Sequence, residues 1–247
     1  MKSIVLSIIT ICFLTLSTFI TNAQVKSKIE KANKQGKAVF LVVTEPSVTN
    51  TKNAEIIANK AHEIYSKSIV ITMDRSNAAN KELLTKYRLS GAQLPLILVI
   101  ASNGVVTGGF ISNQATSEKI VALVPSPKKA EVLLALNNEK SVFVVVSNKS
   151  MSKNKEVISN CEQACEQMRD KAEVVNIDLD DINEQKFLEE LKVNQKASQP
   201  QTYILNTKGQ ITGSLSGAVD VKTLVATATK KNSSCCPSGG SGSCSPK

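Results

Sequence analysis

The chain has 247 residues, which at roughly 100 to 200 residues per domain allows one or two domains. It carries 30 Lys and Arg against 21 Asp and Glu, a formal charge of +9, and its aromatic residues are three tyrosines and six phenylalanines. The lysines are spread along the chain, and we find no zinc-finger spacing, aromatic nucleic-acid-binding strand motif or basic helix with heptads. These features argue against a nucleic-acid partner and predict a solvated basic surface.

The first 23 residues have the pattern of a secretory signal peptide. Lys2 is followed by an apolar run over 4–20 and by the small-residue end Thr21-Asn22-Ala23, so we expect cleavage before Gln24. A retained membrane anchor is the alternative, because the run is close to the minimum of about 17 apolar residues for a span. We therefore expect an exported protein, periplasmic or extracellular, with no stable membrane span after cleavage.

Residues 24–124 alternate between helical and strand patterns. In chain order we expect a helix at 25–33, a strand at 39–43, a helix at 51–66, a strand at 69–73, a helix at 77–87, strands at 95–100 and 105–110, and a helix at 117–123. Asn103-Gly104 between the last two strands is a strong hairpin signal. This order predicts a crossover section followed by a hairpin section.

Residues 125–231 repeat that order. Lys37-Ala-Val-Phe-Leu-Val-Val43 recurs as Lys140-Ser-Val-Phe-Val-Val-Val146, and the sequence around Pro95 recurs around Pro200. A period of about 103 residues is too long for a solenoid repeat of about 20 to 50 residues, so it indicates a duplicated domain. In this copy we expect a helix starting at Pro127, strands at 142–146, 174–177 and 202–205, and helices at 155–170, 183–191 and 222–229.

This order, with a proline leading the third strand and a glycine-containing hairpin after it, resembles the thioredoxin superfamily. The resemblance covers residues 25–231 and implies an α/β fold of two tandem thioredoxin-fold domains of the exported bacterial type. Each domain would have a mixed central sheet flanked by helices, and residues 232–247 would form a flexible tail. By the family pattern, Pro95 and Pro200 would be cis and would face the active-site loop.

Thioredoxin-like oxidoreductases carry Cys-x-x-Cys after the first central strand. The helix N-terminus at that place stabilises a thiolate. The matching segments of this chain, 45–52 and 148–155, contain no cysteine. Dithiol exchange at the usual site is therefore excluded in both domains, and we assign no catalytic residue.

Two cysteines lie on a predicted helix of the second copy. Cys161 and Cys165 share one helix face, which suits a soft metal ion better than a disulfide. The offset of 104 that aligns the following strands places them opposite Ile57 and Ala61, which we expect to face the core. Two interpretations stay open, a pair of core-packing thiols and a redox or metal pair.

Three further cysteines lie in the Gly/Ser-rich tail at Cys235, Cys236 and Cys244. Exposed thiolates on a tether bind soft ions such as Cu(I), Hg(II) or trivalent arsenic, and the adjacent pair resembles the C-terminal Cys-Cys of mercuric reductases. The alternatives are a disulfide to Cys161 or Cys165, an intermolecular disulfide, or a linker remnant. The mature cysteines are odd in number, so at least one thiol is free or joins another chain.

Three functional hypotheses follow, from three classes. The first is an exported, non-catalytic module that binds a protein or peptide, requires no cofactor, and carries the tail as an accessory thiol or soft-metal arm. The second is a thiol–disulfide oxidoreductase with displaced cysteines, in which Cys235 and Cys236 exchange with Cys161 and Cys165. The third is a binding or carrier protein for Cu(I) or Hg(II). The sequence leaves the oligomeric state, the partner and the metal open.

Overall fold

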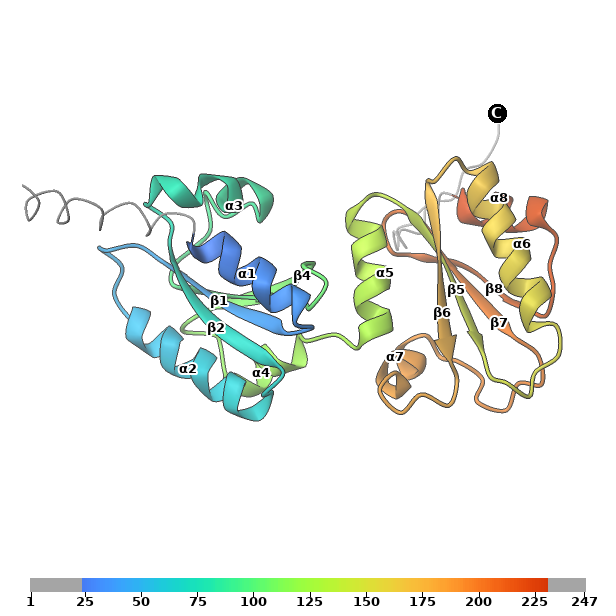
Figure 1. Ribbon diagram of the computed structural model, residues 1–247, viewed down its shortest axis with the longest axis horizontal. Helices are drawn as coiled ribbons and strands as arrows, with labels where there is room; N and C mark the ends of the chain where they lie inside the picture. Colours follow the sequence, from blue (N-terminus) through green and yellow to red (C-terminus); the bar gives the residue numbers. More distant parts are fainter. Residues whose placement is uncertain (1–23, 231–247) are drawn as a thin grey trace, which may run out of the picture. The chain divides into compact units, whose positions relative to one another are not determined.

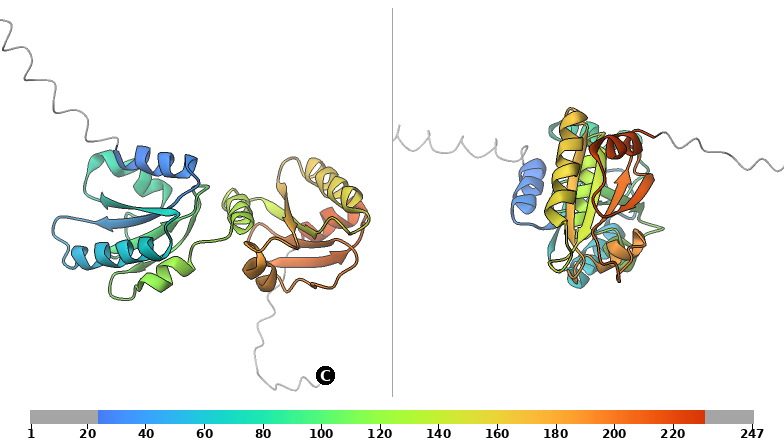
Figure 2. Two further views of the ribbon diagram at one scale, coloured as in Figure 1. Left: turned by 60° about the horizontal axis from the view of Figure 1, so that its bottom comes forward. Right: turned by 90° about the vertical axis from the view of Figure 1, so that its right-hand side faces the viewer.

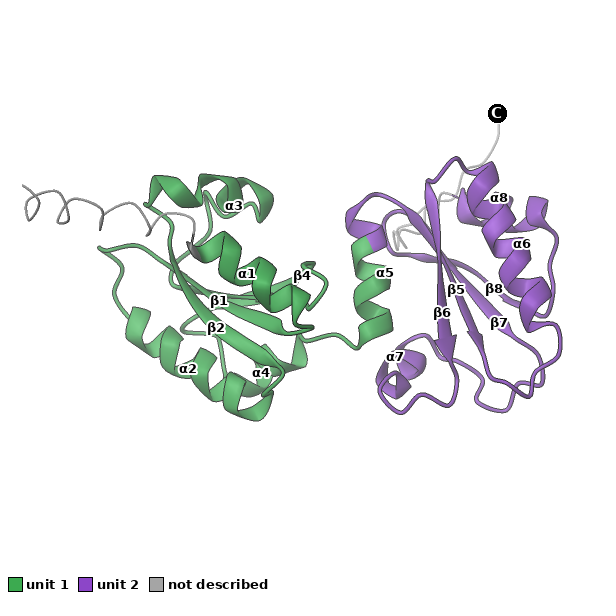
Figure 3. Ribbon diagram, in the orientation of Figure 1, with its two compact units in different colours: residues 1–134 green, residues 135–247 purple. Residues whose placement is uncertain are grey.

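The computed structural model describes residues 24–230. The chain divides into two compact units between Leu134 and Ala135, here called unit 1 and unit 2 (Figure 3). Each unit contains one four-stranded sheet. Within residues 24–230, no helix has the length and apolar character that a membrane crossing requires.

Unit 1 contains the expected crossover and hairpin sections (Figure 1). Its sheet has the order β2-β1-β3-β4, with β1 parallel to β2 and antiparallel to β3, and β3 antiparallel to β4. Its elements are α1 Gln24–Lys34, β1 Ala38–Thr44, α2 Thr51–Ile64, β2 Ser68–Asp74, the 3-10 helix η1 Ala78–Asn80, α3 Lys81–Lys86, β3 Leu96–Ile100, β4 Val106–Ile111 and α4 Ser117–Ala122. Helix α5, Pro127–Asn137, spans the division between the units.

Unit 2 repeats this topology, with the strand order β6-β5-β7-β8 and the same parallel and antiparallel pairings. Its elements are β5 Ser141–Ser147, α6 Asn154–Gln167, β6 Ala172–Asp178, α7 Gln185–Glu190, β7 Gln201–Leu205, β8 Ile211–Ser216 and α8 Val221–Ala228. Helices α6 and α8 cover one face of the sheet, and α7 lies on the other side (Figure 2). The prediction of two α/β domains with mixed sheets is confirmed.

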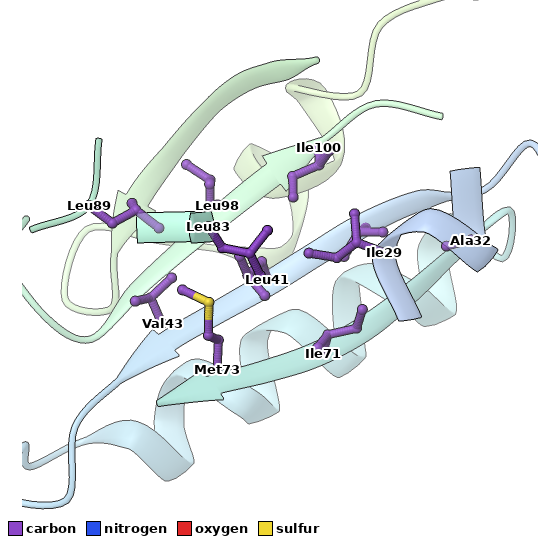
Figure 4. Close-up of a cluster of buried hydrophobic side chains, with 11 residues drawn as sticks. Ile29, Ala32, Leu41, Val43, Ile71, Met73, Leu83, Leu89, Leu98 and Ile100 are labelled. Atoms are coloured by element: carbon purple, nitrogen blue, oxygen red, sulfur yellow. The ribbon is translucent and has the colours of Figure 1, made fainter. Parts of the chain in front are cut away.

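The first central strand of unit 1 is buried along its whole length. Because side chains alternate across a strand, its residues feed two hydrophobic clusters on opposite faces of the sheet. Leu41 packs with Ile29 of α1 and Leu83 of α3 on one face, as Figure 4 shows. Phe40 packs with Ala58 of α2 and with α4 on the other face. The continuous apolar run is therefore the pattern of a strand covered on both sides.

The two units are not related by a single offset. Equivalent strands begin at Ala38 and Ser141, an offset of 103, whereas the next strands begin at Ser68 and Ala172, an offset of 104. The helices between them follow the first offset, because the extra residue lies in the turn before β6. The expected alignment of the cysteines was therefore wrong by one residue. Cys161 lies opposite Ala58, and Cys165 lies opposite His62.

Candidate functional site

A groove of about 270 Å³ lies beside Pro95 in unit 1. Three segments form it: the end of the loop after β1 with the first turn of α2, the segment that leads into β3, and the end of β4. Its lining residues are Thr49, Asn50, Asn53, Gln93, Leu94, Pro95, Ile111, Ser112 and Asn113. All nine side chains are uncharged and none contains sulfur. Pro95 therefore shares the groove with the loop after β1, as the resemblance implied.

The start of α2 brings polar groups to the groove. Asn50 adopts a left-handed backbone, with φ 66° and ψ 10°, which asparagine tolerates better than most residues. Its side chain makes no capping hydrogen bond, so the amide is available to a ligand. Asn53 Nδ2 donates to Ser112 Oγ over 3.1 Å. This bond ties the first turn of α2 to the residue that follows β4.

The segment before β3 presents unbonded backbone. The Leu94–Pro95 peptide is cis, and the Pro95 carbonyl accepts the N–H of Ser112 over 2.9 Å. In the described part of the chain, the backbone amides and carbonyls of Gln93 and Leu94 make no hydrogen bond. Backbone groups are strong donors and acceptors that seek partners, so this segment can pair with an extended segment of another chain.

The corresponding place in unit 2 has a different shape. The expectation of a cis bond at Pro200 was wrong: Leu94–Pro95 is the one cis peptide among residues 24–230, and Gln199–Pro200 has the trans form that X–Pro bonds favour. The Pro200 carbonyl accepts the N–H of Gly217 over 2.8 Å. The side-chain Oε1 of Gln199 lies against Gly217, where an added Cβ would clash with it. The Gln199 side chain therefore covers the position that corresponds to Ser112.

The loop after β5 closes on itself. Asn148 Oδ1 accepts the hydroxyl of Ser150 over 2.7 Å, and Asn148 O accepts from Asn154 Nδ2 over 2.7 Å. Met151 is 7% exposed, so its thioether lies in the interior. Lys153 has φ 68° and ψ 10°, the same conformation as Asn50. The two loops thus follow a similar path into their helices and present different side chains.

The two cysteines of α6 lie in and beside the hydrophobic core. Cys161 is fully buried among Phe143, Val157 and Leu224, and Cys165 is half-buried against the same cluster. Burial raises the pKa of Cys161 to about 12 and that of Cys165 to about 11. Both are therefore protonated thiols at neutral pH, whereas nucleophiles and soft-metal ligands are thiolates.

The other predicted sulfur sites lie at the end of the chain. Cys235, Cys236 and Cys244 lie outside the described residues. In the part of the chain that the structure describes, no group of three or more His, Cys, Asp and Glu side chains is arranged to hold a metal ion.

No family model matches the chain, and no curated protein matches it in sequence. Among solved structures, it is similar to the first two thioredoxin domains of Saccharomyces cerevisiae Eps1p, at 11% identity over 87% of this chain and 98% of that one, with a TM-score of 0.33. It is also similar to the N-terminal domain of alkylhydroperoxide reductase AhpF from Enterococcus faecalis, at 13% identity over 82% and 98% of the two chains, with a TM-score of 0.29. Zinc-bound human ERp44 matches at 9% identity over 83% and 56%, with a TM-score of 0.36.

The strand order, the strand pairings and the flanking helices give each unit a thioredoxin-like fold.

Most of the groove residues were missed by sequence reasoning. Pro95 and the loop after β1 were singled out, but Gln93, Ser112 and Asn113 were not. Pro95 marked the segment that contains Gln93, so a signal for that residue was present. Ser112 and Asn113 are brought to the groove by the pairing of β3 with β4. No local sequence pattern predicts that these two residues lie there.

Proposed function

We propose that this chain is an exported, non-catalytic thioredoxin-like protein that binds an extended segment of a protein or peptide in the unit 1 groove. The observation that carries the proposal is the unbonded backbone of Gln93 and Leu94 within a groove that contains no sulfur and no charge. A backbone edge of this kind binds another chain through main-chain hydrogen bonds, while neighbouring pockets select side chains.

The lining residues indicate the kind of segment that fits. The amides of Asn50, Gln93 and Asn113 can each donate and accept, so they suit peptide groups and polar side chains. Leu94 and Ile111 add apolar contact area. A charged side chain would lose hydration in the groove without gaining an ionic partner there. We therefore expect a preference for uncharged, extended segments.

A random peptide library selected on the mature protein tests this proposal. The variant Asn53→Glu introduces a carboxylate into the groove and copies Glu156, which occupies the same position of α6. Glutamate in the first turn of a helix is favourable, so folding should be preserved. We expect selected peptides to bind this variant at least about tenfold more weakly, by fluorescence anisotropy, because the bound segment would desolvate the carboxylate.

The reverse change, Glu156→Asn in unit 2, is the matched control and should leave affinity unchanged. Peptides that bind wild type and Asn53→Glu equally, or that depend on Glu156, would contradict the assignment to unit 1. A library that yields no binder dependent on the groove would overturn the proposal as a whole.

The proposal has two further parts. We assign export to residues 1–23 and soft-metal binding to residues 231–247. Export predicts that the protein recovered from outside the cytoplasm begins at Gln24, which intact mass would show. A soft-metal arm predicts a tight Cu(I) site that disappears when Cys235 and Cys236 are replaced by serine. The buried Cys161 does not support exchange with the tail, so we put forward no second function.

A further inference from the structure

Arg75 directly follows β2 and lies beside the loop that leads to Asn50. Its backbone N–H donates over 2.8 Å to the carbonyl of Thr44, the last residue of β1, which fixes Arg75 to the central strand. Its side chain is 18% exposed. The guanidinium is therefore largely withdrawn from water, and its N–H groups need partners within the protein.

The guanidinium joins two loops. Nε donates to Glu45 Oε1 over 2.6 Å, and Nη1 donates to the carbonyl of Ala92 over 2.6 Å and to that of Leu89 over a longer 3.4 Å. Glu45 begins the loop after β1, and Ala92 immediately precedes Gln93. Hydrogen bonds from a charged donor are stronger than neutral ones, and a planar fork fixes their direction. One side chain thus holds two of the three segments that form the groove.

Unit 2 holds the corresponding loop in another way. Leu179 takes the place of Arg75, since its N–H donates over 2.9 Å to the carbonyl of Ser147 at the end of β5. Its side chain is buried. The amide of Gln201 makes two hydrogen bonds with the backbone of Asn194, each of 3.0 Å, and these anchor the loop to β7. A guanidinium at this position is therefore not a requirement of the fold.

We infer that Arg75 is the positioning residue of the unit 1 groove, acting through Glu45 and Ala92 to fix Asn50 and Leu94 relative to each other. The role of Arg75 in binding rests on the proposed function, whereas its contacts with Glu45 and Ala92 are present without a ligand. The carbonyl of Ala92 is held one residue before the unbonded backbone, which keeps that backbone in place for a partner. Arg75 lies outside the hydrophobic clusters, so its loss should loosen the loops and leave the sheet intact.

Amide hydrogen exchange on the ligand-free mature protein tests this inference. One variant is Arg75→Lys, which can still pair with Glu45 but lacks the planar fork. The other is Glu45→Asn with Arg75→Leu, which copies unit 2 and leaves no carboxylate unpaired. The amide of Leu89 donates to Leu84 O in α3 and that of Ala92 donates to Leu89 O, and we expect both to exchange about tenfold faster in either variant.

The controls lie in both units. The Val193 amide of unit 2 donates to Leu188 O, just as the Leu89 amide donates to Leu84 O. The exchange rates of the Val193 amide and of the amides of β1 should be unchanged in the Arg75 variants. The variant Lys26→Met, which removes an ion pair with both side chains about half or more exposed, should leave all of these rates unchanged. Unchanged exchange at Leu89 and Ala92 in both Arg75 variants would overturn the inference. Equal acceleration throughout unit 1 would do the same, because Arg75 would then be a general stabiliser.

A second measurement separates this inference from the proposed function. A peptide selected on the wild-type groove should bind Arg75→Lys about tenfold more weakly, while the Tm stays near the wild-type value. An unchanged affinity alongside faster loop exchange would show that Arg75 does not position the binding residues. Exchange is measured without peptide, so a failed selection would overturn the proposed function and leave the loop result standing.

Discussion

The same place in the fold is open in unit 1 and covered in unit 2. In unit 1, the side chain of Asn53 donates to Ser112 Oγ, and both residues line the groove together with Leu94. In unit 2 the matching residues are Gly217 and Gln199, and the Gln199 side chain lies against the glycine. The backbone bond between the two segments is kept in both units, at 2.9 and 2.8 Å. Side chains, and not strand order, therefore decide whether this surface is available.

The loops after β1 and β5 also share a backbone conformation and differ in their side chains. Asn50 and Lys153 adopt the same left-handed conformation, so the chain turns into its helix similarly in both units. Unit 1 then offers amides to the groove, whereas unit 2 buries Met151 and bonds Asn148 within the loop. The duplication kept a scaffold in both units, and the features that suit binding are concentrated in unit 1.

The largest expected change in stability comes from equivalent core residues of the two units. Phe40 and Phe143 are fully buried at equivalent positions of β1 and β5. Replacing either by alanine should lower the free energy of unfolding of its own unit by about 3–5 kcal/mol, through lost burial and a residual cavity. Urea unfolding followed by hydrogen exchange would assign each loss to a unit. Equal weakening of both units by Phe143→Ala would show that they unfold together.

A smaller effect is expected at the edge strands, where unit 1 has Gly109 and unit 2 has Ser214. These residues pair with Leu98 and Tyr203 in equivalent registers. A Cβ on Gly109 would lie 2.7 Å from the carbonyl oxygen of Ile97, which is backbone and cannot rotate away. Gly109→Ser should therefore lower the stability of unit 1 by about 1–3 kcal/mol, measured by urea unfolding. An unchanged stability would mean that β4 can move to accommodate the serine side chain, as β8 accommodates Ser214.

The fold could be predicted from the sequence because its signals are local. Apolar runs marked the central strands, and Asn103-Gly104 marked a hairpin that the structure contains. The error lay in the alignment of the copies. The turn that includes Arg169 and Asp170, both with positive φ, contains the extra residue, and a strand-based offset misplaces the helix before it. That error shifted the residues of unit 1 that we aligned with Cys161 and Cys165 by one position.

The candidate site was less predictable because it depends on contacts between distant segments. The bond between Asn53 and Ser112, and the fork from Arg75 to Ala92, join residues that no sequence pattern associates. The resemblance directed attention to the Pro95 segment, but it could not show that the Gln199 side chain lies against Gly217, the counterpart of Ser112. The family pattern also implied a cis bond at Pro200, which the structure does not have.

The cysteines of α6 provide the next prediction, since the matching helix of unit 1 has Ala58 and His62. Cys161→Ser would place a hydroxyl in an apolar site and should cost unit 2 about 1–3 kcal/mol of stability. Cys165→Ser, at a half-buried position, should cost less. Thermal unfolding of the two variants would rank them. A larger loss for Cys165→Ser would point to a role for that thiol beyond packing.

The same thiols predict a pH dependence for unit 2. Their pKa values rise from the ordinary 9.0 to about 12 and about 11 on folding, so the folded state holds protons that the unfolded state releases. This contribution is complete below pH 9.0 and is lost as the pH rises toward 12. Stability measured by urea unfolding should fall over that range, and less steeply in Cys161→Ala/Cys165→Ala. An identical decline in that variant would assign the effect to other groups, such as Tyr203, whose pKa burial also raises.

The smallest expected effect concerns the left-handed residues that lead into α2 and α6. A lysine in this conformation crowds its Cβ against the backbone, whereas asparagine tolerates it and glycine has no Cβ. Lys153→Gly should therefore stabilise unit 2 by about 0.5–1 kcal/mol, and Asn50→Gly should change unit 1 by less than that. Urea midpoints at constant m-value would measure both. If Asn50→Gly instead weakens peptide binding without changing stability, the Asn50 amide contributes to the groove, which Lys153→Gly in unit 2 should not affect.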